Sequence, residues 1–307
     1  MPFTLCSICT ARADFWMAIP RLHTRWQIRR SDYRVGARTC GERGLALTSA
    51  TALVCCWLQR WRSGLGSEST ENIAKKPKRL KGFATLPLQD PDAAAQELTR
   101  CVRDLGFCGA LVNGFSEVGE AGSAVYYDLP QFRPFWATVH ELGVPFYLHP
   151  RDPSSTKQQC YEGYRWLAGS PWGFGVETSI HALRLMASGL FDEYPKLKVI
   201  LGHLGKGLPF GIWRVDHRIS RGSGTPKARL PMSHYLRENF YITTSGNFRT
   251  QALTNVILEV GADRVLYSVD YPYEDVVEAK VWFEHAAISD YDREKIACTN
   301  AQKLFRL

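Results

Sequence analysis

The sequence predicts an α/β fold built from repeated βα units, of the kind that closes into a (β/α) barrel. Three observations predict it. From residue 81 onward, short apolar runs alternate with stretches of helical spacing, which is the pattern of βα units. Several apolar runs are continuous, as strands buried on both faces of a parallel sheet must be. Three of the runs end in a histidine or an aspartate, at the strand end where barrel enzymes place their active sites.

The expected elements can be followed along the chain. Residues 83–87 form the first expected strand, and residues 92–105 form a helix with Asp90 as its cap. Six strands are expected in all, whereas a closed barrel needs eight. The first two barrel strands would precede residue 81, where no convincing strand is found, so they are doubtful or missing. The other expected strands are 109–113, 145–149, 197–203, 240–244 and 264–270, and the other helices are 132–142, 180–191, 275–287 and 290–304.

Residues 1–80 differ in composition from the barrel expected at 81–307. Ten arginines and three acidic residues give residues 1–65 a net charge of +7, which leaves +1 for the other 242 residues. Three interpretations stay open for residues 1–80. They are a non-homologous or disordered segment from a wrongly predicted exon, an organelle transit segment, which is typically rich in arginine and poor in acids, or a real domain.

Charge and cysteine content exclude several partners. A nearly neutral barrel offers no electrostatic footprint for nucleic acid. The apolar stretch 45–58 is shorter than the roughly 20 residues of a membrane span, so no membrane is expected. Cys6 and Cys9 have the spacing of a zinc or redox half-motif, but no second pair follows. Nine cysteines without a clear signal peptide suit a reducing compartment, and a cytoplasmic location is expected.

Three expected strands end in residues that can carry chemistry: His149, His203 and Asp270. Taken singly, each could have a purely structural role: His149 as a loop histidine, His203 as a residue at the start of a helix, and Asp270 as a turn residue. Together they favour an active site, because the carboxyl ends of barrel strands open into one mouth. Imidazole and carboxylate are ligands for Zn²⁺, Mn²⁺ or Mg²⁺. Two protein ligands are too few for a tight site, so a third is expected on the first strand.

The motifs around these residues resemble a known family, over about three quarters of the chain from residue 81. The resemblance is to the aminocarboxymuconate-semialdehyde decarboxylase family of the amidohydrolase superfamily. Within it, the likeness is greatest to decarboxylases of 2,3-dihydroxybenzoate and 2,6-dihydroxybenzoate (γ-resorcylate). The segments that carry it are P-F-Y-L-H-P-R at 145–151, L-G-H-L-G at 201–205, Y-I-T-T-S-G at 241–246 and S-V-D-Y-P-Y-E at 268–274.

The resemblance implies a distorted TIM barrel with a divalent metal ion held by a strand-1 glutamate, His149 and Asp270. It also implies that His203 is the catalytic histidine. The family's strand-1 motif, E-x-A or H-x-H, does not occur before residue 81. Lys206 stands where the family usually has a glutamate that pairs with the histidine. A cation there should lower the pKa of His203.

The implied activity is a non-oxidative decarboxylation of an ortho-hydroxybenzoate, which makes the protein a carbon–carbon lyase. Its expected partner is a small aromatic carboxylic acid, bound through a divalent metal ion without an organic cofactor, in a homo-oligomer. Asp270 would deliver a proton to the ring carbon that bears the carboxylate, and His203 would act as a general base on the hydroxyl group. The residues expected to bind the substrate are Arg151, His181, Tyr271 and Tyr273.

Two other functions remain open. A hydrolase of the same superfamily would cleave a lactone or an amide with a metal-bound water and Asp270 as base. A catalytically dead or truncated barrel would explain the missing strand-1 ligand and the cation at Lys206.

Overall fold

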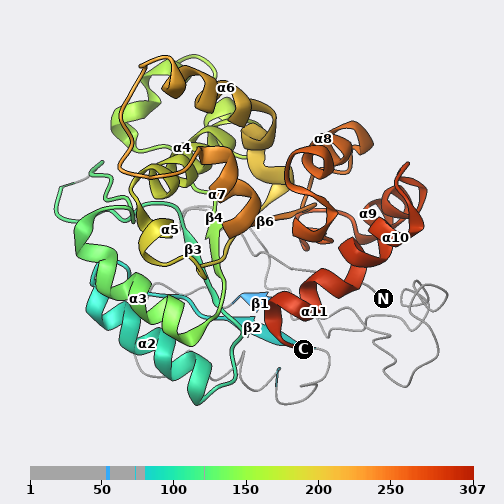
Figure 1. The fold of residues 1–307 in the computed structure, drawn as a ribbon, viewed down its shortest axis with the longest axis horizontal. Coiled ribbons are helices and arrows are strands. Elements are labelled where there is room, and N and C mark those ends of the chain that lie inside the picture. The colour runs from blue at the N-terminus through green and yellow to red at the C-terminus, as the bar shows by residue number, and fades with distance from the viewer. Residues whose placement is uncertain (1–52, 56–72, 74–79, 121) are drawn as a thin grey trace.

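The computed structural model describes residues 53–55, 73, 80–120 and 122–307 (Figure 1). Within this part of the chain, β1 pairs with β2, and β3 to β7 form a five-stranded parallel sheet in sequential order. A parallel bridge between Ala84 and Ala110 joins β2 to β3. Each strand therefore lies beside the next one along the chain, as the predicted βα units require. The strands are β1 (Leu53–Cys55), β2 (Lys81–Phe83), β3 (Ala110–Asn113), β4 (Phe146–His149), β5 (Val199–Leu201), β6 (Phe240–Thr243) and β7 (Val265–Leu266).

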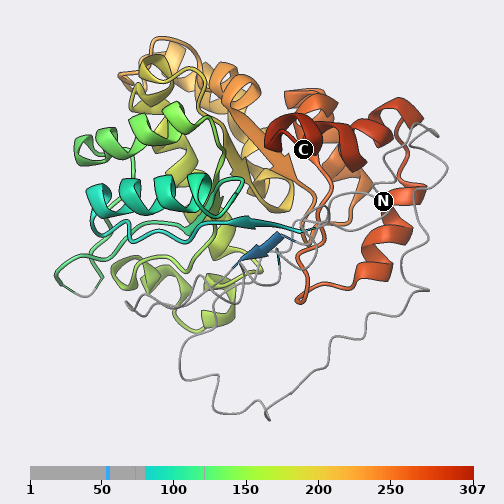
Figure 2. The same ribbon diagram turned by 90° about the horizontal axis from the view of Figure 1, so that it is seen from below.

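Helices separate consecutive strands from β2 onward, which confirms the predicted alternation. Figures 1 and 2 both place α2 beside α3 at one end of the strand series and the C-terminal helices α9 to α11 at the other. The α-helices of the described residues are α2 (Pro91–Arg103), α3 (Arg133–Leu142), α4 (Gly173–Ala187), α5 (Leu190–Glu193), α6 (Leu208–Ser220), α7 (Met232–Asn239), α8 (Thr250–Val260), α9 (Val276–His285), α10 (Asp290–Glu294) and α11 (Asn300–Phe305). Short 3₁₀ turns lie at η3 (Pro130–Phe132), η4 (Ser155–Tyr161), η5 (Arg165–Ala168), η6 (His203–Gly207) and η7 (Ala262–Arg264), and a π turn at η8 (Lys295–Thr299).

Helix α2 begins directly after Asp90, the residue that was predicted to cap it. The Asp90 carboxylate accepts hydrogen bonds from the backbone N–H groups of Asp92 and Ala93, at 3.1 and 3.0 Å. These bonds satisfy two of the donors that a helix N-terminus leaves unpaired. The helix then buries Ala94 and Leu98, so its apolar spacing faces the core as predicted.

The core has two parts because each strand sends alternate side chains to opposite faces. The larger part lies between the sheet and the surrounding helices, and Trp136 and Phe146 are fully buried in it. The smaller part lies on the inner face of the strands. It holds one or more side chains from each of β2 to β7 and reaches the C-terminal helix, where Phe305 packs edge-on against Phe83 with ring centroids 5.7 Å apart.

Two expectations about the elements are wrong. We expected no convincing strand before residue 81, but β1 lies there, inside the apolar stretch 45–58. A strand of three residues is too short to show a period in the sequence. The helix expected at 180–191 is α4, which begins at Gly173, followed by the separate short helix α5. Two glycines in its first turn hide the start of α4, because glycine is a poor helix former.

No helix of the described part of the chain combines the length and the apolar character that crossing a bilayer requires. The predicted shortness of the stretch 45–58 concerns residues that lie largely outside this part of the chain.

Truncation of a side chain on the inner face should be costly. Phe83 is 1% exposed and packs against Tyr147 and Phe305. We expect Phe83→Ala to lower the free energy of unfolding by about 3–5 kcal/mol, because it opens a cavity in the barrel interior. The measurement is urea denaturation.

Phe210→Ala is the matched control, because Phe210 is 83% exposed on α6. This substitution should change the free energy of unfolding by no more than about 0.5 kcal/mol. Equal losses for the two variants would show that β2 does not line a packed interior.

Candidate active site

The three predicted site residues lie at the carboxyl ends of three parallel strands. His149 is the last residue of β4, His203 follows β5 by two residues, and Asp270 follows β7. The His203 Nε2 and Asp270 Oδ2 atoms are 4.0 Å apart. Leu148 pairs with Leu201, so His149 lies beside the end of β5. The structure therefore brings these residues to one mouth, as the strand-end argument predicted.

The backbone around His203 adopts a conformation that side chains disfavour. From His203 to Gly207 every φ is positive, at 55°, 53°, 72°, 55° and 82°. Only Gly205 and Gly207 enter this left-handed region without a steric penalty. Strain of this kind persists where the surrounding structure fixes it, and it clusters at functional sites. The turn re-aims the chain, so the His203 side chain faces Asp270, whose φ is 82°.

His149 is held in the tautomer that a metal ligand needs. The ring is 1% exposed, and its Nδ1 lies 2.9 Å from the carbonyl oxygen of Pro150. Because a carbonyl only accepts, Nδ1 carries the proton and Nε2 carries the lone pair. Burial lowers the pKa of His149 to about 4, while the Pro150 carbonyl raises it and Lys206 lowers it further. His149 is therefore neutral near pH 7.

Asp270 is a buried carboxyl group. It is 8% exposed, and none of the described residues gives its Oδ1 atom a hydrogen-bond partner. Burial raises the pKa of Asp270 to about 7, while Lys206 lowers it and Glu274 raises it. A buried carboxylate oxygen without a donor is the group that a cation would satisfy.

His203 is neutral because of burial and of Lys206. Burial lowers the pKa of His203 well below its ordinary value, and Lys206 and His149 lower it further. The predicted effect of Lys206 on this pKa is thereby confirmed, although burial is the larger cause. A hydrogen bond to the Ser245 backbone raises the pKa again. This bond orients the ring in a chain that has no glutamate at position 206.

The donor set fits a divalent first-row metal ion. One neutral imidazole and one carboxyl group face the mouth, and both are ligands for Zn²⁺ or Mn²⁺. Among the residues that the structure describes, no group of three His, Cys, Asp or Glu side chains has metal-binding spacing. The third ligand was expected on the first strand, and that prediction concerns residues outside the described part of the chain.

Asn113 is a further polar residue at a strand end, and it was not among the predicted site residues. Asn113 ends β3 and is the register partner of His149. The signal was present, since the run Gly109 to Val112 is apolar and ends in a carboxamide in the same way that its neighbours end in histidine or aspartate. An amide side chain there adds a donor and an acceptor to the mouth.

Two residues predicted to bind the substrate are engaged in packing. The Arg151 guanidinium lies 4.0 Å from the Phe115 ring centroid and donates to the Phe115 carbonyl oxygen at 2.6 Å. His181 lies in the interior of α4 rather than at its start, and its Nε2 accepts the Tyr127 N–H at 3.1 Å. Its ring is 1% exposed.

The other two predicted binding residues reach the surface. Tyr271 and Tyr273 follow Asp270 directly and are 37% and 53% exposed. They are therefore accessible to a small molecule at the mouth, whereas His181 is enclosed.

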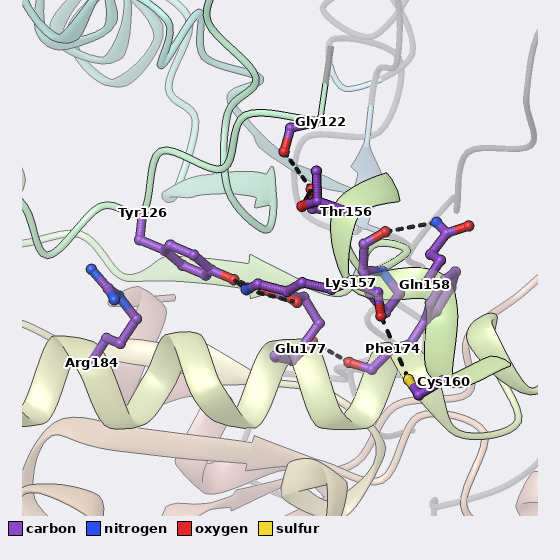
Figure 3. Close-up of polar contacts among 12 residues, drawn as sticks. Gly122, Tyr126, Thr156, Lys157, Gln158, Cys160, Phe174, Glu177 and Arg184 are labelled. Atoms are coloured by element: carbon purple, nitrogen blue, oxygen red, sulfur yellow. Dashed lines mark hydrogen bonds and ion pairs between the residues drawn. The ribbon is translucent and has the colours of Figure 1, made fainter. Parts of the chain in front are cut away.

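A buried polar cluster ties the loops around the mouth to α4 (Figure 3). The Tyr126 hydroxyl donates to the Glu177 carboxylate, and Lys157 Nζ donates to the Tyr126 hydroxyl at 2.5 Å. Glu177 is 2% exposed. Arg184 lies over the Tyr126 ring at 4.5 Å from its centroid. Because Tyr126 follows β3 and Lys157 follows β4, the cluster holds the loops on both sides of His149 against one helix.

The chain is similar in sequence to one protein family and to individual members with a known activity. The sequence profile of the family described as Amidohydrolase matches residues 59–307. The γ-resorcylate decarboxylase of a Polaromonas species is 56% identical over 239 residues, which are 77% of this chain and 73% of that protein. The profile match begins before residue 81, and the predicted boundary between residues 80 and 81 stays a prediction.

Solved structures show the same likeness. A 2,6-dihydroxybenzoate decarboxylase in complex with 2,6-dihydroxybenzoate is similar with a TM-score of 0.75 and 56% identity, covering 78% of this chain and 74% of that one. A dihydroxybenzoic acid decarboxylase from a Polaromonas species, with bound manganese and the inhibitor 2-nitroresorcinol, is similar with a TM-score of 0.75 and 56% identity. It covers 78% of this chain and 72% of the other. These similarities confirm the predicted TIM-barrel fold.

Removal of the Glu177 carboxylate from the polar cluster of Tyr126, Lys157, Glu177 and Arg184 should destabilise the protein. Glu177→Ala leaves the buried Tyr126 hydroxyl without its acceptor, and we expect the free energy of unfolding to fall by about 2–3 kcal/mol. Urea denaturation measures the change. Glu117→Ala is the control, because Glu117 is an exposed glutamate 3.5 Å from Arg151, and such rim pairs contribute at most about 1 kcal/mol. A loss no larger for Glu177→Ala would contradict the assigned role of the cluster.

Proposed function

The chain belongs to the amidohydrolase family, and we propose on that basis that it is a metal-dependent decarboxylase that releases CO₂ from 2,6-dihydroxybenzoate. The observation that carries the proposal is its 55–56% identity to four γ-resorcylate decarboxylases over three quarters of the chain. The arrangement of His149, His203 and Asp270 at one barrel mouth supports it.

We propose Mn²⁺ as the metal ion. Two similar decarboxylases, for dihydroxybenzoic acid and for 5-carboxyvanillate, have bound manganese in their solved structures. In this chain His149 and Asp270 would hold the ion, with a third ligand from outside the described residues. When bound, the ion supplies a Lewis acid and a template for a carboxylate with a neighbouring hydroxyl group.

The reaction needs one proton at the ring carbon that bears the carboxylate. Asp270 is the donor in the proposal, because its carboxyl group is buried at the mouth and burial raises its pKa. The proton forms a C–H bond, the bond between the ring and the carboxylate breaks, and its electron pair restores the aromatic ring as CO₂ leaves. Asp270 is left as a carboxylate and regains a proton from solvent. The overall change exchanges a carboxylate for a proton, so no oxidant or reductant is required.

In the proposal, His203 acts on a hydroxyl group of the substrate, while Asp270 supplies the proton to the ring. As a neutral imidazole 4.0 Å from the carboxyl group, it is placed to accept a hydrogen bond from a phenolic hydroxyl group of the substrate. The bond to the Ser245 backbone holds the ring in position for that contact. Tyr271 and Tyr273 would form a wall for a planar aromatic acid. The expected homo-oligomer and the expected cytoplasmic location remain predictions.

The assay that tests the proposal compares two substrates. Purified chain supplied with Mn²⁺ should release CO₂ from 2,6-dihydroxybenzoate and leave simple lactones intact. Lactone hydrolysis without CO₂ release would favour the hydrolase of the same superfamily. Neither activity, in a folded protein that binds no metal, would favour the dead barrel.

Metal removal should abolish CO₂ release. After dialysis against a chelator the rate should fall to the background of the assay, since the substrate would lose its template and Lewis acid. Addition of Mn²⁺ should restore the rate. A chelated, metal-free protein that keeps its full rate would contradict the proposed metal dependence.

The role of His203 gives a second expectation. We expect His203→Asn to lower kcat by roughly 10²- to 10⁴-fold, the usual contribution of a general base. Steady-state kinetics at saturating Mn²⁺ measures it. His234→Asn, which changes an exposed histidine on α7, is the control and should keep the wild-type kcat. Similar kcat values for the two variants would remove His203 from the mechanism.

A further inference from the structure

A layer of hydroxyl groups lies inside the barrel beneath the site residues. It consists of Tyr147, Thr243, Ser245 and Ser268, which we call the hydroxyl layer. All four are almost completely buried, with exposed fractions of 0% or 1%. They come from β4, from β6 and the residues that follow it, and from the segment after β7.

The members of the layer form one chain of hydrogen bonds. The Tyr147 hydroxyl lies 3.3 Å from Thr243 Oγ1, and Thr243 Oγ1 lies 2.7 Å from Ser245 Oγ. The Ser245 hydroxyl then donates to Ser268 Oγ at 2.9 Å. Since a hydroxyl group both donates and accepts, such a chain satisfies buried groups without any charge.

A hydroxyl layer in this place needs an explanation. The interiors of such barrels are filled by branched apolar side chains. The register partners of the layer are of this kind, since Leu111 and Ile200 pair with Tyr147, and Leu266 pairs with Thr243. Valine or alanine would fill the same volume without the desolvation cost of a hydroxyl group. The hydroxyl side chains therefore occupy particular positions among apolar neighbours on the inner face of the strands.

Strand alternation places this layer directly under the site. Side chains two residues apart on a strand lie on the same face, roughly 7 Å apart along it. Tyr147 precedes His149 by two residues, and Ser268 precedes Asp270 by two. Ser245 provides the backbone hydrogen bond that orients His203. Each site residue thus has a member of the layer beside or beneath it.

A glycine after β5, the strand between β4 and β6, leaves space for the side chain of Tyr147. Gly202 follows β5, and a Cβ atom there would lie 2.9 Å from the Tyr147 hydroxyl oxygen. Any side chain at this position would therefore displace Tyr147 from Thr243. The glycine immediately before His203 is what allows the tyrosine to reach across from β4 to β6.

We propose that the hydroxyl layer is a positioning network that fixes the spacing of His149 and Asp270 and the orientation of His203. It acts by bonding β4, β6 and the segment after β7 to one another one layer below the mouth. The inference rests on the proposed function in taking His149 and Asp270 as the metal ligands. Groups that support metal ligands in this way commonly contribute 10- to 100-fold in metal affinity or activity.

The test breaks the chain of hydrogen bonds at its centre. Thr243→Val keeps the shape of the side chain and removes both bonds of Thr243. Thr178→Val is the matched control, because Thr178 is also buried and its hydroxyl donates at 2.7 Å to the Phe174 carbonyl within α4. Mn²⁺ affinity is measured by titrating the chelated full chain and following free Mn²⁺ by electron paramagnetic resonance, alongside urea denaturation and CO₂ release.

We expect Thr243→Val to weaken Mn²⁺ binding by about 10-fold or more and to lower kcat. The control should bind Mn²⁺ as the wild type does, even if both variants lose similar stability. Unchanged Mn²⁺ affinity in Thr243→Val, or an equal loss in Thr178→Val, overturns the inference. Ser268→Ala gives a second, smaller deletion for the case in which Thr243→Val does not fold, and it carries the same expectation and the same refutation.

The wild-type chain separates this inference from the proposed function. Mn²⁺ binding without CO₂ release would overturn the proposed activity and leave the affinity comparison valid. Absence of Mn²⁺ binding by the wild type would overturn both.

Discussion

The approach of the His203 imidazole to the Asp270 carboxyl group is the contact on which the site depends. Neither residue makes this contact from an extended strand backbone, since His203 has a φ of 55° and Asp270 a φ of 82°. Such conformations cost on the order of 1–2 kcal/mol each for residues other than glycine. The parallel strands supply the compensation, because they hold β5 and β7 on either side of β6 in fixed register.

Burial explains the electrostatics of the same site. His149 and His203 are neutral because a charged imidazole would be poorly solvated there, and the pKa of Asp270 rises for the same reason. Lys206 is the nearby positive charge that acts on all three residues. The positive charge of Lys206 disfavours an imidazolium ion beside it and favours the ionised form of Asp270.

The sequence was sufficient to predict the repeating fold and three strand-end residues, since both follow from buried parallel strands. It did not reveal β1, because three residues carry no period. His181 was misplaced because the glycines at the start of α4 hid the first two turns of the helix. The left-handed turn at His203 could not be predicted either, because Leu204 and Lys206 occupy conformations that their side chains disfavour. The hydroxyl layer could not be predicted, because its four members belong to three separate segments of the chain and only the folded sheet brings them together.

The most direct measurement of the central claim is anomalous diffraction from crystals of the full chain grown with Mn²⁺. We expect one strong manganese peak at the barrel mouth, about 2 Å from His149 Nε2 and from a carboxylate oxygen of Asp270. A peak elsewhere, or no peak at the mouth of a folded barrel, would contradict the assignment of these residues as a metal centre.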